Sequence, residues 1–370
     1  MGAVVLNQNL HLNPSKGPQK LIGNNNDVIE EIGGLIRVYK DGKVERPQIV
    51  PCVAASLADP NHDDQLGVVT SMDVVIDKST NVWARFYVPK MSTAIITTTA
   101  ATQLLAQKLK IPLLVYFHGG GFCVGSAAWS CYHEFLSNLS TKLSCIIMSV
   151  NYRLAPENPL PAAYEDGFKA LSWLKRQAVE RNENEWWWSE QCDFSKIFLV
   201  GDSAGANIAY NLSMRLNSDD AKRLKPLTFK GTVLVQPFFG GESRTESEKF
   251  SPRRSALSLA ASDTYWRLAL PAGATRDHPW CNPMAKGSVE EVSNDNDKIL
   301  LPMMVCISEM DILKDRNLEF CGALGKKMMK VEYVVYGGVG HAFQILNKSQ
   351  LSQTRTQEMM AHIKAFIIRY

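Results

Sequence analysis

The chain from residue 111 onward contains six short, continuously apolar runs, and these constrain the fold most. They read IPLLVYF, SCIIMSV, KIFLV, GTVLVQPFF, LPMMVCIS and VEYVVY. Strands that are apolar at almost every position are typical of a parallel sheet covered by helices on both faces. The segments between the runs, such as YEDGFKALSWLKRQA, are long enough for crossover helices. The sequence therefore predicts a doubly wound, mostly parallel α/β sheet.

The chain ahead of these runs has a different pattern. GLIRVYKDGKVERP places two strand-like pieces around Asp41-Gly42, a strong hairpin signal. VVTSMDVVID and NVWARFYVP follow, joined by a turn-like Lys-Ser-Thr. We therefore expect antiparallel N-terminal strands, a mobile segment over residues 1–30, one α/β domain over 31–370, and a Thr- and Ala-rich surface insertion at about 90–110.

Composition excludes several classes of protein. The chain has 370 residues, 45% of them hydrophobic, which suits one large α/β domain or two smaller ones. The formal net charge is only +3 and the chain has no Lys/Arg-rich block, so we expect no nucleic-acid partner. No apolar run approaches the length that crosses a bilayer, so we expect no membrane span.

Signals for export, lipidation and metal binding are missing from the sequence. The N-terminus is a poor signal peptide, and Leu6 breaks the myristoylation pattern. The eight cysteines have neither Cys-x-x-Cys nor zinc-ligand spacing. We interpret them as reduced thiols and expect a cytoplasmic protein, with the nucleus as the alternative, that holds no metal and no other cofactor.

Three consecutive glycines follow the first apolar run, in HGGGFCVGS. A phosphate-binding loop would need glycine at Val124 or a Gly-Lys-Ser/Thr sequence, and the chain has neither. Bare backbone N–H groups at the carboxyl end of a strand suit an oxyanion hole, because glycine lets the backbone come close to a bound acyl group. A flexible turn is the alternative interpretation.

Ser203 lies in VGDSAGAN, between the apolar run KIFLV and a helix-like stretch. Asp and Ser are ordinary helix N-caps, so a plain strand-to-helix turn is one interpretation, and we expect Asp202 to be structural. The other is a nucleophile on a sharp turn, with Gly201 and Gly205 relieving the crowding and the N–H of Ala204 serving as an oxyanion donor.

Ser203, Asp311 and His341 each follow a different apolar run, in the chain order Ser, Asp, His. That order is the one expected of α/β-hydrolases. A serine is a weak nucleophile until a base takes its proton, and the histidine base needs an acid to fix its tautomer. These residue types at these places therefore predict a serine hydrolase.

Three motifs together resemble the plant carboxylesterases of the hormone-sensitive-lipase-like branch of α/β-hydrolases. They are HGGG at 118–121, GDSAG at 201–205 and NYRLAPE at 151–157, and the resemblance runs from about Gly34 to the C-terminus. Within the family, the segments are most similar to the member numbered seventeen. One departure is Gly205-Ala206-Asn207, where the family usually has Gly-Gly-Asn.

The resemblance implies a serine esterase that acts on small carboxylic esters, with a cap built partly from residues 1–30 and a hydrolase domain over 31–370. It implies Ser203 as nucleophile, His341 as base and Asp311 as its acid partner. The oxyanion donors would come from the glycine motif, in which His118 is structural, and from the residue after the nucleophile: Gly119, Gly120, Gly121 and Ala204.

Other functions occur on the same fold. One is a lyase or cyclase that eliminates water or acetate, since a histidine base and an oxyanion hole also serve proton abstraction. Another is a non-catalytic hormone receptor, but receptors of this type lack the catalytic histidine and this chain has His341. For the substrate pocket we expect Trp266 as a wall, and for Trp186, Trp187 and Trp188 either packing on the body or cover of a groove.

Overall fold

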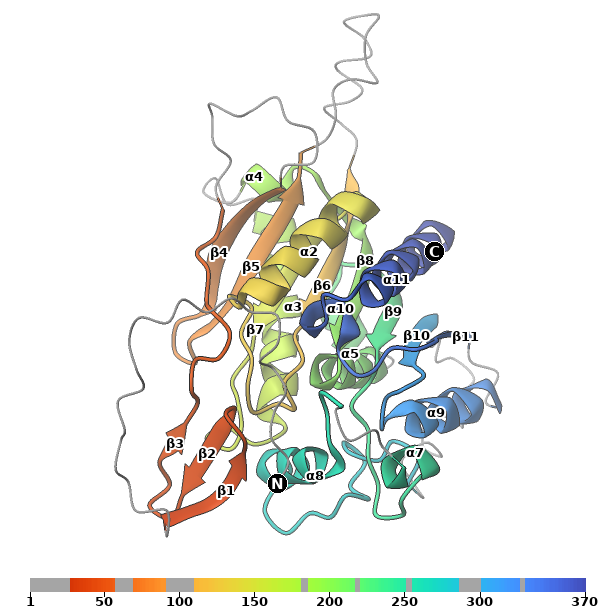
Figure 1. The fold of residues 1–370 in the computed structure, drawn as a ribbon. Helices are drawn as coiled ribbons and strands as arrows, with labels where there is room; N and C mark the ends of the chain where they lie inside the picture. The colour runs from red at the N-terminus through yellow and green to blue at the C-terminus, as the bar shows by residue number, and fades with distance from the viewer. Residues whose placement is uncertain are drawn as a thin grey trace, which may run out of the picture.

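The computed structural model describes most of the chain. The described residues are 27–56, 69–90, 110–180, 186–216, 220–250, 255–285, 301–326 and 330–370. Most of the N-terminal segment 1–30 and almost all of the predicted insertion at 90–110 lie outside them. The described ranges contain one large sheet covered by helices and one small separate sheet (Figure 1).

The large sheet has eight strands in the order β11-β10-β9-β8-β6-β7-β5-β4. They are β4 (Val69–Asp77), β5 (Val82–Pro89), β6 (Ile111–Phe117), β7 (Ile146–Asn151), β8 (Cys192–Asp202), β9 (Phe229–Val235), β10 (Met303–Ser308) and β11 (Val331–Tyr336). Neighbouring strands in the part of the sheet ordered β11-β10-β9-β8-β6-β7 are all parallel. Strand β5 pairs antiparallel with both β4 and β7. The mostly parallel sheet with an antiparallel start is therefore confirmed.

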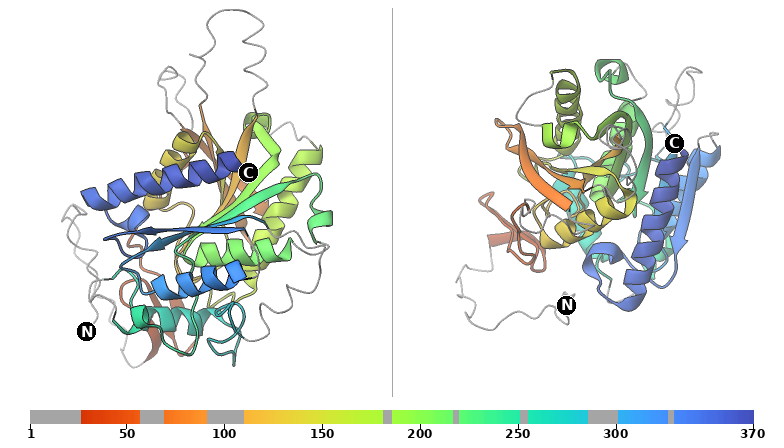
Figure 2. Two further views of the ribbon diagram at one scale, coloured as in Figure 1. Left: turned by 90° about the vertical axis from the view of Figure 1, so that its right-hand side faces the viewer. Right: turned by 90° about the horizontal axis from the view of Figure 1, so that it is seen from above.

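Helices cover both faces of this sheet (Figure 2). The longer ones are α2 (Ser130–Leu143), α3 (Ala162–Glu180), α5 (Ala204–Arg215), α8 (Leu259–Ala269), α9 (Lys314–Lys326) and α11 (Gln350–Arg369). The shorter ones are α4 (Trp186–Ser189), α6 (Asp220–Arg223), α7 (Glu246–Lys249) and α10 (Phe343–Leu346). Helices α2 and α11 lie on one face, and α3, α5 and α9 lie on the other (Figures 1 and 2).

Strand β6 shows why the apolar runs are continuous. Leu113 and Val115 belong to the core on the side of α3 and α5, whereas Leu114 and Tyr116 belong to the core on the side of α2 and α11. Successive side chains of a strand point to opposite faces, so a strand buried on both faces needs apolar residues throughout.

The small sheet is made by β1 (Val28–Ile32), β2 (Ile36–Tyr39) and β3 (Val44–Glu45), all antiparallel. The predicted hairpin is present between β2 and β3, with Gly42 at a φ of 84°. This hairpin does not join the large sheet, whose antiparallel part is β4 and β5 alone. Instead β1 lies beside α8, where Arg267 pairs with Glu30 at 2.7 Å (Figure 1).

Candidate active site

Ser203 occupies the sharp turn between β8 and α5. Its φ of 52° and ψ of −118° are unusual for a residue with a side chain. A Cβ on Gly201 would collide with the backbone of Gly205, and a Cβ on Gly205 would collide with the backbone of Phe117. The two glycines are therefore needed for this tight turn, as the motif predicted. Ser203 thus has a strained backbone directly after a buried strand, and strain of this kind is typical of functional sites.

The structure brings the three predicted polar residues together. Ser203 Oγ lies 2.9 Å from His341 Nε2, and His341 Nδ1 lies 2.7 Å from Asp311 Oδ2. The side chains come from the ends of β8, β10 and β11, and each is at most 9% exposed. A base between a hydroxyl and a carboxylate at these distances can take a proton from the hydroxyl.

The charge of Asp311 sets the basicity of His341. Burial alone would lower the pKa of His341, but the charge and hydrogen bond of Asp311, helped by the charge of Asp202, outweigh burial and raise it. A raised pKa makes the imidazole a better proton acceptor. The imidazolium that forms would be stabilised by the same carboxylates.

Gln236 holds the loop that carries His341, and no motif in the sequence points to it. Its Oε1 accepts a hydrogen bond from the N–H of Ala342 at 2.7 Å, and its Nε2 donates to Ser308 Oγ at 2.7 Å. Gln236 is 1% exposed and has a φ of 49°. A buried residue in this conformation is held there by its partners, so Gln236 ties the histidine loop to the end of β10.

The glycine loop is held by hydrogen bonds to its carbonyl groups. The Gly119 carbonyl accepts from His118 Nδ1 at 2.8 Å, and the Gly120 carbonyl accepts from the N–H groups of Cys123 and Val124 at 3.0 Å. The C=O and N–H of a peptide unit point in opposite directions in one plane. Fixing these carbonyls therefore fixes the directions of the next two N–H groups, those of Gly120 and Gly121.

Three backbone N–H groups near the turn remain open. Within the described chain, no acceptor is found for those of Gly120, Gly121 and Ala204. Gly120 and Gly121 have φ values of 113° and 57°, which suit glycine. Ala204 is the first residue of α5, where the N–H has no partner inside the helix. Unpaired, preorganised donors are the arrangement that stabilises an oxyanion.

Gly119 differs from the other predicted donors. Its N–H donates to Tyr132 Oη at 2.7 Å and to Asp202 Oδ1 at 3.1 Å. This N–H is therefore engaged inside the protein, and Gly119 anchors the loop where the sequence predicted a free donor. Sequence reasoning missed this because Tyr132 comes from a helix that is distant from Asp202 in the chain.

A family model described as an alpha/beta hydrolase fold matches residues 114–345. The chain belongs to this family. It is 51% identical over 345 residues to "Probable carboxylesterase 6" of Arabidopsis thaliana, and the match covers 93% of this chain and 92% of that protein. It is 34% identical to a 2-hydroxyisoflavanone dehydratase of Glycine max, over 86% of this chain and 93% of that one.

Solved structures of other proteins have the same fold. The thermostable carboxylesterase EstE1 from a metagenomic library has a TM-score of 0.63 at 23% identity, over 85% of this chain and 91% of that one. The hydrolase is thus one of the plant carboxylesterases, a serine hydrolase group. The expected likeness to the member numbered seventeen is corrected, since the 51% identical relative is numbered six.

His118 is a structural part of the hydrolase's glycine loop. It is fully buried and stacks on Tyr152, with ring centroids 4.4 Å apart. Burial lowers the pKa of His118 to about 4, so the imidazole is neutral at ordinary pH. In this state Nδ1 carries the proton that it donates to Gly119.

Trp266 does not have the predicted position. Its side chain has no exposed surface and stacks on Phe238 at 4.6 Å, so it forms core and does not line an open pocket. The preceding residue, Tyr265, contacts the glycine loop instead. Its ring lies so close to Gly121 that a Cβ there would collide with it. Neighbours on a helix point about 100° apart, so the choice between them depends on the phase of α8.

One tryptophan of the WWW sequence is placed clearly. Trp188 is fully buried and stacks on Phe86 at 4.4 Å and on Trp173 at 6.0 Å. It packs on the body of the protein, one of the two outcomes expected. The side chains of Trp186 and Trp187 lie outside the described residues.

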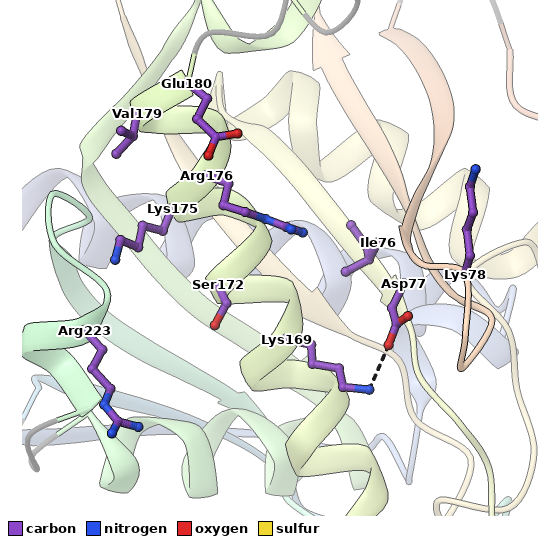
Figure 3. Close-up of a pocket in the computed structure, with 10 residues that line it drawn as sticks. All are labelled: Ile76, Asp77, Lys78, Lys169, Ser172, Lys175, Arg176, Val179, Glu180 and Arg223. Carbon is purple, nitrogen blue, oxygen red and sulfur yellow. Dashed lines mark hydrogen bonds and ion pairs between the residues drawn. The ribbon is translucent and has the colours of Figure 1, made fainter.

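A surface hollow of about 700 Å³ lies on the outer side of α3 and shares no residue with the site above (Figure 3). Its lining is Ile76, Asp77, Lys78, Lys169, Ser172, Lys175, Arg176, Val179, Glu180 and Arg223. Figure 3 shows Lys175 and Arg176 leaving α3 in different directions, while Lys169 reaches Asp77. Cations that diverge do not enclose a ligand.

The described residues contain neither a metal-binding cluster nor a membrane-spanning helix. No group of three or more His, Cys, Asp or Glu side chains there is arranged to hold a metal ion. Of the helices that the structure describes, none is both long and apolar enough to span a bilayer.

Proposed function

We propose that this chain hydrolyses small carboxylic esters through an acyl-enzyme formed on Ser203. The observation that carries the proposal is the line of contacts from Ser203 through His341 to Asp311, at 2.9 and 2.7 Å. The open N–H groups described above lie on the same turn and on the neighbouring loop. A nucleophile, its base and oxyanion donors are the parts that acyl transfer requires.

The reaction would proceed in two halves. In the first, Ser203 Oγ attacks the ester carbonyl while His341 Nε2 takes its proton, and the N–H groups of Gly120, Gly121 and Ala204 stabilise the oxyanion. The C–O bond to the alcohol then breaks, and His341 protonates the departing oxygen. In the second half, His341 takes a proton from a water that attacks the acyl carbon, the bond from that carbon to Ser203 Oγ breaks, and His341 returns the proton to Oγ as the acid leaves.

The N-terminal segment contributes to a cap over this site in our proposal. The described part, β1 to β3, is tied to α8 by Glu30 and Arg267 and to the glycine loop by Arg46, which donates to the Cys123 carbonyl at 2.6 Å. A domain boundary at residue 30 falls inside β1. The cap segment would therefore extend through β3, and the hydrolase domain would begin with β4.

Elimination is a second candidate reaction because a relative with 34% identity is named a dehydratase. The contact between Ser203 and His341 favours hydrolysis, since an elimination needs the base but no serine nucleophile. Mass spectrometry of the products separates the two reactions, because hydrolysis adds water and elimination does not.

The proposal is tested by turnover of p-nitrophenyl acetate and butyrate by the wild-type protein and by Ser203→Ala. We expect turnover by the wild type alone. Equal rates for the two proteins would overturn the proposal. Esters of graded acyl length would then define the acid that the pocket accepts.

A further inference from the structure

Asp202 is a buried carboxylate that the proposed mechanism does not use. It directly precedes Ser203 and is 1% exposed. Its Oδ1 accepts from Tyr116 Oη at 2.7 Å and from the N–H of Gly119 at 3.1 Å, and its Oδ2 accepts from Tyr132 Oη at 2.9 Å. An ionised carboxylate is buried only at high cost unless such donors surround it.

The hydroxyl of Tyr132 joins two parts of the site. It donates to Asp202 and also accepts from the N–H of Gly119 at 2.7 Å. The contact is tight, because a Cβ on Gly119 would lie 2.7 Å from Asp202 Oδ2. The start of the glycine loop, helix α2 and the end of β8 therefore meet at this point.

This junction fixes the distance between the N–H donors of the glycine loop and Ser203. Asp202 is bonded to Ser203, and Gly119 is bonded to Gly120, whose N–H is one of the open donors. Any movement of Gly119 away from Asp202 would move the donors away from the nucleophile. A misplacement of about 1 Å can cost about a hundredfold in rate.

We propose that Tyr132 and Asp202 are positioning residues that hold the glycine loop at its working distance from Ser203. This inference rests on the proposed esterase function. Neither side chain needs to touch the substrate. Tyr132 acts through the N–H of Gly119, and Asp202 acts through both Tyr132 and that N–H.

The charge of Asp202 is consistent with this role. Burial raises the pKa of Asp202 to about 6, while the hydrogen bonds from Tyr116 and Tyr132 and the positive charge of His341 oppose the rise. The carboxyl is thus mostly ionised at neutral pH and acts only as an acceptor, which its three donors require.

The chain offers a matched pair of variants for the test, Tyr132→Phe and Tyr116→Phe. Both tyrosines are at most 2% exposed, and both donate to Asp202. Only Tyr132 accepts from Gly119. A purely structural role in the buried network would make the two variants behave alike, whereas a positioning role separates them.

We expect Tyr132→Phe to lower kcat by about 10- to 100-fold with little change in KM, and Tyr116→Phe to lower it by less than about threefold. The affinity for a trifluoromethyl ketone, which forms an oxyanion on the serine, should fall in Tyr132→Phe by the same factor as kcat/KM. Thermal unfolding of the two variants should shift by similar amounts.

Equal losses of kcat in the two variants, or an unchanged kcat in Tyr132→Phe, would overturn the proposal. If Tyr132→Phe does not fold, Asp202→Asn takes its place, because its amide keeps the shape and one acceptor. The same fall in kcat and in ketone affinity is expected there, and normal values would contradict the role. Failure of the esterase function itself would show separately, as a wild type without turnover.

Discussion

The polar side chains at the end of the sheet and those on the outside of α3 differ in burial and in direction. At the carboxyl ends of β8, β10 and β11, Ser203, Asp311 and His341 are nearly buried and point toward one another. On the outside of α3, the charged side chains of Lys169 and Lys175 lie in a surface hollow, and Lys169 remains 41% exposed in its pair with Asp77 (Figure 3).

The difference has a physical cause. A buried polar group costs free energy unless it has partners, so a protein keeps one only where the partners are built around it. An exposed lysine or arginine has no such cost, because its charged end stays in water while its aliphatic stem lies along the surface. Buried groups that converge therefore indicate a site, and a high density of exposed charge does not.

The largest effect is expected for Ser203→Ala. Loss of the nucleophile should lower kcat by about 10⁵- to 10⁶-fold, with the residual rate coming from the oxyanion donors. Ser213→Ala, in helix α5 that follows Ser203, is the matched control, since that buried hydroxyl donates to the Tyr210 carbonyl. A comparable loss in the control would mean that damage to α5, and not loss of the nucleophile, explains the result.

Asp311→Asn should lower kcat by about 10³- to 10⁴-fold, because the tautomer of His341 is no longer fixed. The pH profile should also change. The base must be neutral, so activity is lost as the pH falls through the pKa of His341, which Asp311 raises. Without that charge the acid limb of kcat/KM should move to lower pH. Asp315→Asn serves as control, and an unmoved limb would contradict the pairing.

Gly121→Ala should lower kcat by about 10²-fold. The new Cβ would collide with the Tyr265 ring, and the φ of 57° disfavours alanine, so the N–H must shift away from the oxyanion. Gly322→Ala is the control, because no atom lies within 4 Å of a Cβ there. Similar activity in both variants would remove Gly121 from the oxyanion hole.

The smallest effect is expected in the hollow on α3. Lys175→Ala combined with Arg176→Ala should change kcat/KM by less than about twofold and the free energy of unfolding by less than about 1 kcal/mol. Steady-state kinetics and denaturant unfolding measure both. A tenfold loss of activity would contradict this prediction, because it would give the hollow a part in function.

The sheet and the chain order of the three catalytic candidates could be predicted because both depend on short, local stretches of sequence. Each apolar run marks a strand, and the polar residue after it falls at the same edge of the sheet. The engagement of Gly119 could not be predicted, since it depends on Tyr132, a side chain that only the tertiary fold brings to Asp202. The expected position of Trp266 was wrong because the sequence does not give the phase of α8. That phase decides whether Tyr265 or Trp266 faces the glycine loop.

Trapping the covalent intermediate shows whether Ser203 is the nucleophile. The protein is mixed with p-nitrophenyl acetate, quenched in acid within the first turnover, and digested for peptide mass spectrometry. We expect one acetyl group, on the peptide that contains Ser203, and none in Ser203→Ala. Rapid hydrolysis with no acetyl group on that peptide, or an acetyl group on another residue that disappears as product forms, would contradict it.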